Sequence, residues 1–317
     1  MQPLESLASL CLNRHVALTI GVFDGVHLGH QHLLGGVVQR ARAMGGLGIV
    51  VTFHPHPQLV LRPSLQPAYL TTLEERLALM AGTGIDLTVT LRFTVETAQV
   101  TAREFVTALC RAFRLVELRV GPDFALGHKR QGTIPVLRDL GRELGFSVAV
   151  AEPWEAEGVV VSSTRIRERL KEGDVAHAAR LLGRLHAVSG TVVTGDRRGR
   201  TLGFATANLE TAPELLLPAD GVYAVYAEVD GRSYPAVSNI GRRPSFDNAP
   251  RTFEVHLLDF EGDLYGRQVA VRFAQRLRGE VRFPDLSALA AQIRADAAQA
   301  RAVLAPASLP APHGSAI

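Results

Sequence analysis

Short apolar runs alternate with segments of helical periodicity from residue 15 to about residue 183. The runs at 15–23, 46–53, 85–93, 116–121 and 146–154 are rich in Val, Ile and Leu at consecutive positions. Such continuous runs are typical of strands buried on both faces. The segments between them, 28–44, 71–82, 101–113 and 134–144, have the spacing of amphipathic helices. The alternation predicts an α/β domain whose parallel sheet is covered by helices on both faces.

Two of the expected helices begin with capping boxes. Thr71 or Thr72 precedes Glu74 or Glu75, and Thr101 precedes Glu104, so hydroxyl and carboxylate can satisfy the first backbone donors. A parallel sheet of this kind binds its ligands at the carboxyl ends of the strands. We therefore look for the functional residues in the loops that follow the strands.

The pattern changes after residue 186. From Val188 strand follows strand, with Asp230-Gly231 as a hairpin signal, and the next helical pattern covers residues 283–304. This predicts an antiparallel barrel or sandwich closed by a C-terminal helix. The Pro- and Ala-rich residues 305–317 are expected to be disordered.

Length and composition fit two soluble domains. The chain has 317 residues, 47% hydrophobic and 21% charged, and a net charge of +3. Its arginines are scattered, which argues against a nucleic-acid partner. Only Lys129 and Lys171 are lysines, so a G-x-x-x-x-G-K-[ST] phosphate loop is excluded and a Schiff-base lysine would have to be one of these two.

Cysteine usage and hydropathy predict the compartment. Cys11 and Cys110 form no C-x-x-C pair and lie in apolar contexts, as buried free thiols of a reducing cytoplasm would. We find no signal peptide and no run of about 18 apolar residues. The chain is expected to be cytoplasmic, without a membrane partner.

The stretch GVFDGVHLGH, residues 21–30, stands where the first strand turns into a helix. Gly21 and Gly25 permit a tight turn, and Gly29 permits a close approach to the first helical turn. His27 and His30, three residues apart, would lie on one face and donate hydrogen bonds to phosphate at the helix N-terminus. Alone, this pattern is more often a glycine-rich corner with exposed histidines.

Three further polar loops follow strands. They are TFHPHP (residues 52–57), VGPDFALGHKRQG (residues 120–132) and VSSTRIR (residues 161–167), in which Ser162, Ser163 and Thr164 can cap a helix and Arg165 can bind phosphate. Each loop also has an ordinary structural explanation. Four such loops in one sheet favour a shared cleft.

Residues 21–30 and 161–167 resemble the H-x-G-H nucleotidyltransferase superfamily, and the other two loops resemble its FMN adenylyltransferase branch. The resemblance implies a Rossmann-like domain that transfers an adenylyl group from ATP to a phosphate. It implies that His27 and His30 hold the ATP phosphates and that Ser163, Thr164 and Arg165 close on the other side. The remaining nucleotide- or flavin-binding residues that it implies are Gly21, Phe23, Asp24, Gly25, Gly29, Asp123 and Phe124.

A second set of motifs lies in the expected barrel. Thr206 and Asn208, at i and i+2 on extended chain, offer hard oxygen ligands suited to Mg²⁺. In residues 252–258 the alternation places Phe253 and Val255 on one face and Glu254 on the other, where it could accept a proton. Alone, each has an ordinary explanation, a loop-capping Asn and a solvent-facing Glu.

Residues 189–209, 238–246 and 251–266 together resemble riboflavin kinase. The resemblance implies a small antiparallel barrel in which Thr206 and Asn208 bind Mg²⁺–ATP, Gly199 and Gly203 belong to the nucleotide loop, and Glu254 is the catalytic base. The sequence departs from the family pattern at two places. Ala205 stands where proline is usual, and residues 183–186 read GRLH where GRPY is usual.

The two motif sets follow the order of bifunctional riboflavin kinase/FAD synthetase. The resemblance implies an FMN adenylyltransferase domain over 1–184, a riboflavin kinase barrel over 185–305 and a tail over 306–317. Riboflavin, FMN and ATP would be the small-molecule substrates, FAD the product and Mg²⁺ the metal at both sites. Whether the chain forms a homo-oligomer is left open.

Three alternatives stand beside this interpretation. One is an adenylyltransferase alone, acting on FMN or another phosphate, with a barrel that only binds flavin or forms a dimer. A second is a flavin-binding sensor without catalysis, which would not need Thr206, Asn208 and Glu254. The third is a zinc site built from five histidines, His27, His30, His32, His54 and His56.

Overall fold

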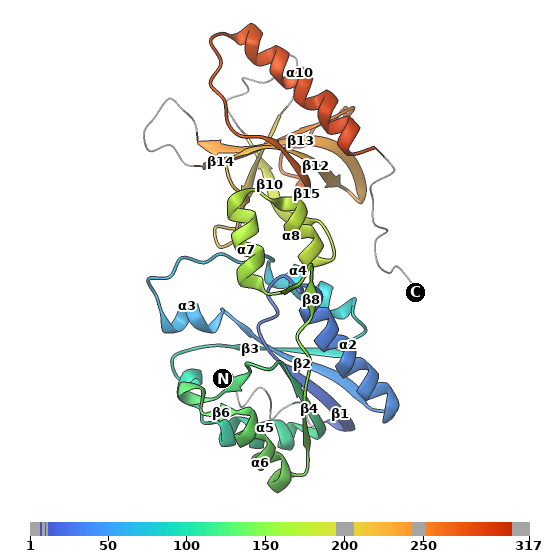
Figure 1. The fold of residues 1–317 in the computed structure, drawn as a ribbon, viewed down its shortest axis with the longest axis vertical. Coiled ribbons are helices and arrows are strands. Elements are labelled where there is room, and N and C mark those ends of the chain that lie inside the picture. Colours follow the sequence, from blue (N-terminus) through green and yellow to red (C-terminus); the bar gives the residue numbers. More distant parts are fainter. Residues whose placement is uncertain (1–6, 8–9, 11, 195–205, 243–250, 306–317) are drawn as a thin grey trace. The chain divides into compact units, whose positions relative to one another are not determined.

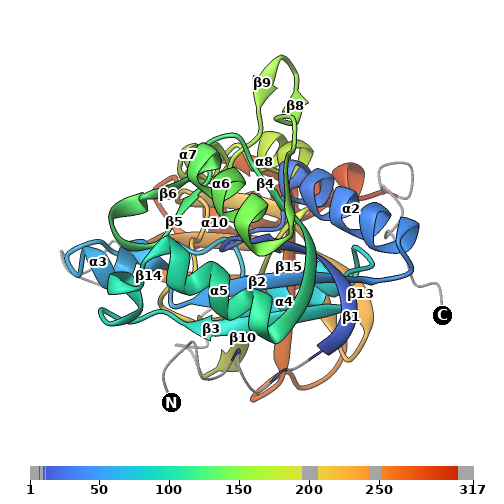
Figure 2. The same cartoon turned by 90° about the horizontal axis from the view of Figure 1, so that it is seen from below.

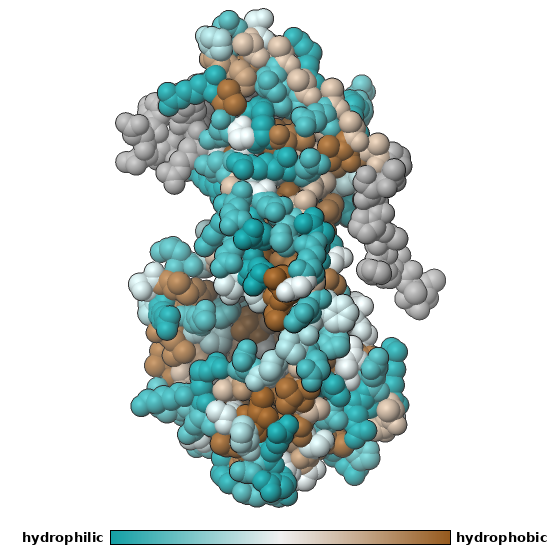
Figure 3. Space-filling model, viewed as in Figure 1, coloured by the Kyte–Doolittle hydropathy of each residue, from teal (hydrophilic) through white to brown (hydrophobic). Residues whose placement is uncertain are grey.

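The computed structural model describes residues 7, 10, 12–194, 206–242 and 251–305. The chain divides into two compact units. The first comprises Met1–Pro67 and Thr72–Val161, and the second comprises Ala68–Thr71 and Ser162–Ile317. Within the described ranges, no helix has both the length and the apolar character needed to span a bilayer. Figure 3 shows polar residues covering much of the visible face of both units, with apolar residues in smaller groups between them.

The first unit is built on a five-stranded parallel sheet in the order β3-β2-β1-β4-β7 (Figure 1). The strands of this sheet are β1 (Leu12–Ile20), β2 (Leu47–His54), β3 (Leu87–Arg92), β4 (Phe113–Val120) and β7 (Ser147–Val150). The helices are α2 (Leu28–Ala43), α3 (Pro57–Leu61), α4 (Leu73–Ala81), α5 (Ala102–Ala112) and α6 (Ile134–Leu144), with 3-10 turns η1 (Thr97–Gln99) and η2 (His128–Arg130). Two short hairpins, β5 (Ala125–Leu126) with β6 (Gly132–Thr133) and β8 (Glu155–Ala156) with β9 (Val159–Val160), complete the unit. Figure 2 shows the second hairpin extending away from this sheet.

Helices cover both faces of this sheet, as the continuous apolar strands predict. Alternate residues of one strand face opposite layers. Val16 and Leu18 of β1 pack into the cluster that holds the buried residues of α5 and α6, whereas Ala17 packs with those of α2 and α4. Both expected capping boxes form, Thr72 with Glu75 and Thr101 with Glu104.

The second unit contains a closed antiparallel barrel in the order β10-β11-β14-β13-β12-β15, which resolves the expected choice between barrel and sandwich. The barrel strands are β10 (His186–Val193), β11 (Ala207–Thr211), β12 (Gly221–Val229), β13 (Arg232–Arg242), β14 (Arg251–Leu257) and β15 (Gln268–Arg278). The helices are α7 (Ser163–Glu172), α8 (Val175–Leu182) and α10 (Leu286–Val303). The turn at Asp230-Gly231 joins β12 to β13, and both residues have positive φ. Such a two-residue loop is the hairpin that this dipeptide predicts.

Strand β12 is buried on both faces, which explains its almost unbroken apolar sequence. Ala224 and Tyr226 pack with Ala300 and Leu304 at the end of α10 and beyond it. Residues of the opposite parity, such as Tyr223, face the barrel interior, where Tyr223 packs edge-on against Phe273. An ion pair also holds α10, because Arg278 donates to the Asp296 carboxylate at 2.7 Å and Asp296 is 3% exposed.

His186 is buried in the same interior, at the position where the family pattern has tyrosine. Its ring stacks on Phe273, and a ring nitrogen lies 3.4 Å from the Leu216 carbonyl. Burial lowers the pKa of His186 to about 4, with a smaller contribution in the same direction from Arg184. The imidazole is therefore neutral in the folded protein at neutral pH.

We expect His186 to make the free energy of unfolding depend on pH. Above pH 6.5 the imidazole is neutral in both states, but below it the unfolded chain takes up a proton that the folded chain does not accept until about pH 4. Stability should therefore fall by up to about 1.4 kcal/mol per pH unit across that window. Urea unfolding of the protein and of His186→Phe at several pH values measures this: the variant should lose the contribution of His186 to the slope, and exposed His15→Ala should retain it. Parallel curves for the protein and His186→Phe would contradict the assignment.

Candidate functional site

The turn between β1 and α2 has an unusual backbone. Phe23, Gly25 and Val26 have positive φ values of 55°, 80° and 37°. Glycine adopts such values without strain, but a β-branched valine does so only where the surroundings hold it. Gly21 is needed beside this turn because a Cβ there would lie 3.0 Å from the Phe23 ring. The turn is thus tightly specified.

His27 and His30 pack together at the start of α2. His27 is the N-cap with extended backbone, so it precedes the helix instead of sharing its first turn, and its Nδ1 accepts from the His30 backbone N–H at 3.2 Å. The two rings stack with centroids 3.6 Å apart, and the Phe23 ring meets His30 edge-on at 5.2 Å. Because Nδ1 accepts, neutral His27 carries its proton on Nε2. That tautomer can donate a hydrogen bond to an anion.

Gly29 allows this packing. A Cβ at this position would lie 3.2 Å from the His27 ring and 3.4 Å from the Val161 carbonyl oxygen. The close approach expected from the sequence is therefore made by the cap histidine and by the last residue of this unit. Asp24, also expected at the site, is buried, with 3% exposure.

The loop after β4 begins at the same sheet edge as this turn, because carboxyl ends of parallel strands share an edge. Asp123 is exposed, and its carbonyl accepts from Arg130 at 2.9 Å. Phe124 packs against the core cluster of α5 and α6. The structure thus brings the 21–30 turn and the 120–132 loop to one edge, as expected, without showing a contact between Asp123 and the histidines.

Ser163, Thr164 and Arg165 form the first turn of α7 in the second unit. Ser162 is its N-cap and accepts from the Arg165 backbone N–H at 3.3 Å, as the sequence predicts. Thr164 is exposed, whereas Ser163 and Arg165 are partly buried. Their position relative to His27 and His30 stays a prediction, because those histidines belong to the first unit.

In the barrel, Thr206 directly precedes β11 and Asn208 lies within it. Thr206 is exposed and Asn208 partly buried, while the neighbours Ala207 and Leu209 are buried. This alternation puts Thr206 and Asn208 on the same side of the strand, away from the interior. The expected nucleotide-loop residues Gly199 and Gly203, and Ala205, lie outside the described residues.

Glu254 lies between two amide side chains in the register of the barrel. β11 pairs Asn208 with Glu254, and β13 pairs Asn239 with the same residue on its other side. Directly opposed residues have Cβ atoms about 5 Å apart. Phe253 and Val255 point to the interior, so Glu254 belongs to the opposite face, as the alternation predicts. The row Asn208–Glu254–Asn239 brings an expected metal ligand beside the expected base.

Two residues of this face were not anticipated. Asn239 is one, because only the register with β14 identifies it. Glu280 is the other: a Cβ on Gly241, two residues beyond Asn239, would lie 1.7 Å from Glu280 Oε1. A second carboxylate therefore covers Gly241, and any side chain there would displace it. The sequence resemblance includes the segment 238–246, but it identifies no single residue of that segment as functional.

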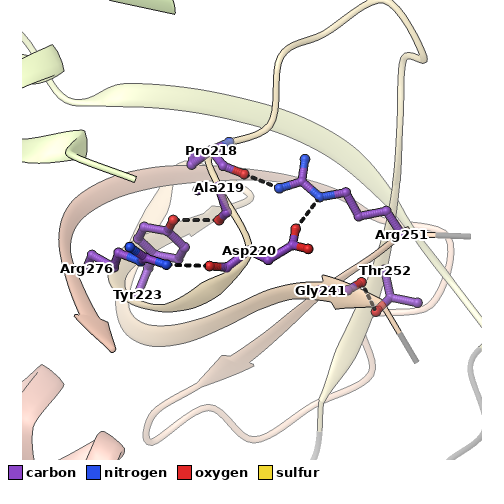
Figure 4. A network of polar contacts seen from close by, with 8 residues as sticks. All are labelled: Pro218, Ala219, Asp220, Tyr223, Gly241, Arg251, Thr252 and Arg276. Atoms are coloured by element: carbon purple, nitrogen blue, oxygen red, sulfur yellow. Dashed lines mark hydrogen bonds and ion pairs between the residues drawn. The ribbon is translucent and has the colours of Figure 1, made fainter. Parts of the chain in front are cut away.

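A polar network fixes the start of β14, three residues before Glu254 (Figure 4). Arg251 donates to the Asp220 carboxylate at 2.6 Å and to the Pro218 carbonyl. Arg276 donates to the Asp220 carbonyl at 2.7 Å, and Tyr223 donates to the Ala219 carbonyl at 2.6 Å. The network ties the segment before β12 to β14 and β15, and so holds the strand that carries Glu254.

Among the described residues, no group of three or more His, Cys, Asp or Glu side chains is arranged to hold a metal ion. The zinc alternative thus finds no support in that part of the chain.

Comparison with known proteins decides the family. The FAD synthetase family matches residues 11–165, and the riboflavin kinase family matches residues 182–304. The bifunctional riboflavin kinase/FMN adenylyltransferase of Pseudomonas fluorescens is 41% identical over 296 residues, covering 93% of this chain and 94% of the relative. The chain belongs to the bifunctional riboflavin kinase/FMN adenylyltransferase family.

A second relative and a solved structure match this chain over a similar length. The bifunctional riboflavin kinase/FMN adenylyltransferase of Escherichia coli K12 is 41% identical over 288 residues, covering 90% of this chain and 91% of its own. A crystal structure described as a macrolide-efflux protein from Streptococcus pneumoniae matches with a TM-score of 0.85 and 32% identity, covering 93% and 96% of the two chains. The similarity therefore extends over both units.

Proposed function

We propose that this chain makes FAD from riboflavin in two ATP-dependent steps, with the barrel forming FMN and the α/β domain converting FMN to FAD and pyrophosphate. The observation that carries the proposal is the order of the two family matches, since each falls on a different part of the chain and together they cover most of it. The domain division that we propose is 1–184 and 185–305. We also propose that riboflavin, FMN and ATP are the small-molecule substrates and that the protein is cytoplasmic.

For the kinase step, we assign Glu254 as the base that takes the proton from the attacking 5′-hydroxyl of the ribityl chain. The hydroxyl oxygen then bonds to the γ-phosphorus of ATP, and ADP leaves. The flanking amide of Asn239, opposite Glu254 in the register, is suited to orient the carboxylate. A carboxylate oriented in this way would be ready to accept the proton.

Thr206 and Asn208 are assigned as the residues that would hold Mg²⁺ with ATP. Their hydroxyl and amide oxygens are hard ligands, and Asn208 lies next to Glu254 in the barrel register, so the donor set fits this ion. Bound there, Mg²⁺ would neutralise charge on the nucleotide phosphates. The exposure of Thr206 leaves room for that ligand.

For the adenylyl step, no protein base is required, because the FMN phosphate is already an anion and attacks the α-phosphorus of ATP itself. The protein must orient the reactants and offset charge on the leaving pyrophosphate. We assign this to His27 and His30, whose stacked rings follow the β1–α2 turn, and to Ser163, Thr164 and Arg165. The N-terminus of a helix also attracts phosphate, through its backbone N–H groups and the helix dipole.

One assay tests the proposed function. The protein is incubated with ATP, Mg²⁺ and either riboflavin or FMN, and both flavin products are followed by chromatography. Riboflavin should give FMN and then FAD. Absence of both products would refute the proposal, whereas FAD from FMN but never from riboflavin would select the adenylyltransferase with a non-catalytic barrel.

A further inference from the structure

Arg76 is a charged residue on the buried face of α4. It precedes Met80 by one turn of α4, and residues four apart share a helix face. Met80 belongs to the core cluster beneath α2, and both side chains are 0% exposed. Burying a cation is costly unless its hydrogen bonds are satisfied. The hydrogen bonds of Arg76 therefore indicate what this residue does in the interior.

The guanidinium of Arg76 reaches the turn between β1 and α2. Its Nη1 donates to the Val22 carbonyl at 2.9 Å, and Thr52 Oγ1 at the end of β2 donates to the same carbonyl at 3.2 Å. This carbonyl directly precedes Phe23, the first of the residues with positive φ. Arg76 and Thr52 therefore both hydrogen-bond to the turn immediately before its residues with positive φ.

The first turn of α4 is itself fixed, so Arg76 is a rigid support. The Thr72–Glu75 capping box closes immediately before it, with the Glu75 N–H donating to Thr72 Oγ1 at 3.1 Å and the Thr72 N–H donating to Glu75 Oε2 at 3.0 Å. On the far side of the turn, Gln31 donates to the Val26 carbonyl at 2.9 Å. The strained backbone is thus held from α4, from β2 and from α2.

We propose that Arg76 is a positioning residue for adenylyl transfer, which holds the β1–α2 turn so that His27, His30 and the α2 N-terminus meet the ATP phosphates. This rests on the proposed function of that turn. The buried positive charge would also favour an anion bound at this turn, because an interior of low polarity strengthens electrostatic attraction. Arg76 itself touches no reacting atom in this assignment and acts through the backbone that it supports.

Variants of Arg76 test the inference by steady-state kinetics of FAD formation from FMN. Arg76→Gln should lower kcat about 100-fold, the loss expected when reacting groups are misplaced by about 1 Å. The KM for FMN should stay unchanged, because in this proposal the turn holds the ATP phosphates and not the flavin. Arg76→Lys, which keeps the charge and a donor, should recover much of the loss. Arg103→Gln removes an exposed positive charge from the same unit and should change nothing.

Riboflavin kinase activity of each variant is the control for effects outside the α/β unit, since the barrel belongs to the other unit. If Arg76→Gln destabilises its domain, Thr52→Val supplies an independent test, because it removes the second hydrogen bond to the Val22 carbonyl at nearly constant volume. It should lower the same kcat about fivefold.

Thermal unfolding shows whether Arg76→Gln and Thr52→Val are folded. The inference is overturned if both are folded and form FAD at the rate of the unaltered protein. It is also overturned if the loss in Arg76→Gln follows only the unfolded fraction and Arg76→Lys restores nothing. Failure of the proposed function would appear differently, since the unaltered protein would then form no FAD from FMN.

Discussion

Glu254→Gln should stop FMN formation while FAD formation from supplied FMN continues. The amide keeps the shape of the side chain and its place between Asn208 and Asn239, but it cannot accept the proton of the attacking hydroxyl. We expect kcat for riboflavin phosphorylation to fall about 1000-fold, within the range that general base catalysis contributes. Chromatography of the products from riboflavin and, separately, from FMN measures both steps.

The matched control for this variant is Glu210→Gln. Glu210 is an exposed carboxylate on β11, two residues beyond Asn208, and its loss removes the same charge from the strand that pairs with β14. It should leave both steps unchanged. If Glu254→Gln phosphorylates riboflavin at the unaltered rate, the base lies elsewhere. Loss of both steps in folded Glu254→Gln would instead show that the two sites are not independent.

The register around Glu254 shows what the sequence could and could not predict. The alternation in residues 252–258 correctly places Phe253 and Val255 inside and Glu254 on the other face, because a strand has a period of two. Asn239 lies 15 positions away in the chain, and only the pairing of β13 with β14 makes it a neighbour. Register depends on how the whole barrel closes, which local patterns do not contain.

The α/β unit gives a similar result. The continuous apolar runs predict a sheet covered on both faces, and the strand–helix order predicts where polar loops meet. The pattern did not predict the short helix α3 or the two small hairpins, because five or fewer residues carry too little periodicity. Arg76 was missed for another reason. It reads as the polar residue of an amphipathic helix, and only its 0% exposure shows that it points inward.

Of the departures from the family pattern, the structure describes the one at His186 but not the one at Ala205. His186, where tyrosine is usual, lies on Phe273 in the barrel interior, so its effect is on stability and its dependence on pH. Ala205, where proline is usual, lies outside the described residues, and its effect on the neighbouring Thr206 stays a prediction. Proline would restrict φ immediately before Thr206, one of the proposed metal ligands, and alanine would not.

His30→Ala should stop FAD formation and leave FMN as the end product from riboflavin. The His30 ring contacts the rings of His27 and Phe23, so in the proposed assignment it is a preorganised donor for phosphate. Removing one such donor typically lowers kcat by about 100- to 1000-fold. His32→Ala, two residues further along the same helix and exposed, is the matched control and should retain both steps.

His27 needs a different substitution, because its Nδ1 also caps α2. His27→Asn retains an N-cap acceptor, so its loss of FAD formation should reflect the missing imidazole donor, whereas His27→Ala should in addition destabilise the helix by about 1 kcal/mol. Thermal unfolding separates the two effects, and product analysis from riboflavin identifies the blocked step. Unaltered FAD formation in folded His30→Ala and His27→Asn would mean that the β1–α2 turn binds phosphate through its backbone alone. If both variants accumulate FMN, the stacked pair is the phosphate-binding element that its geometry suggests.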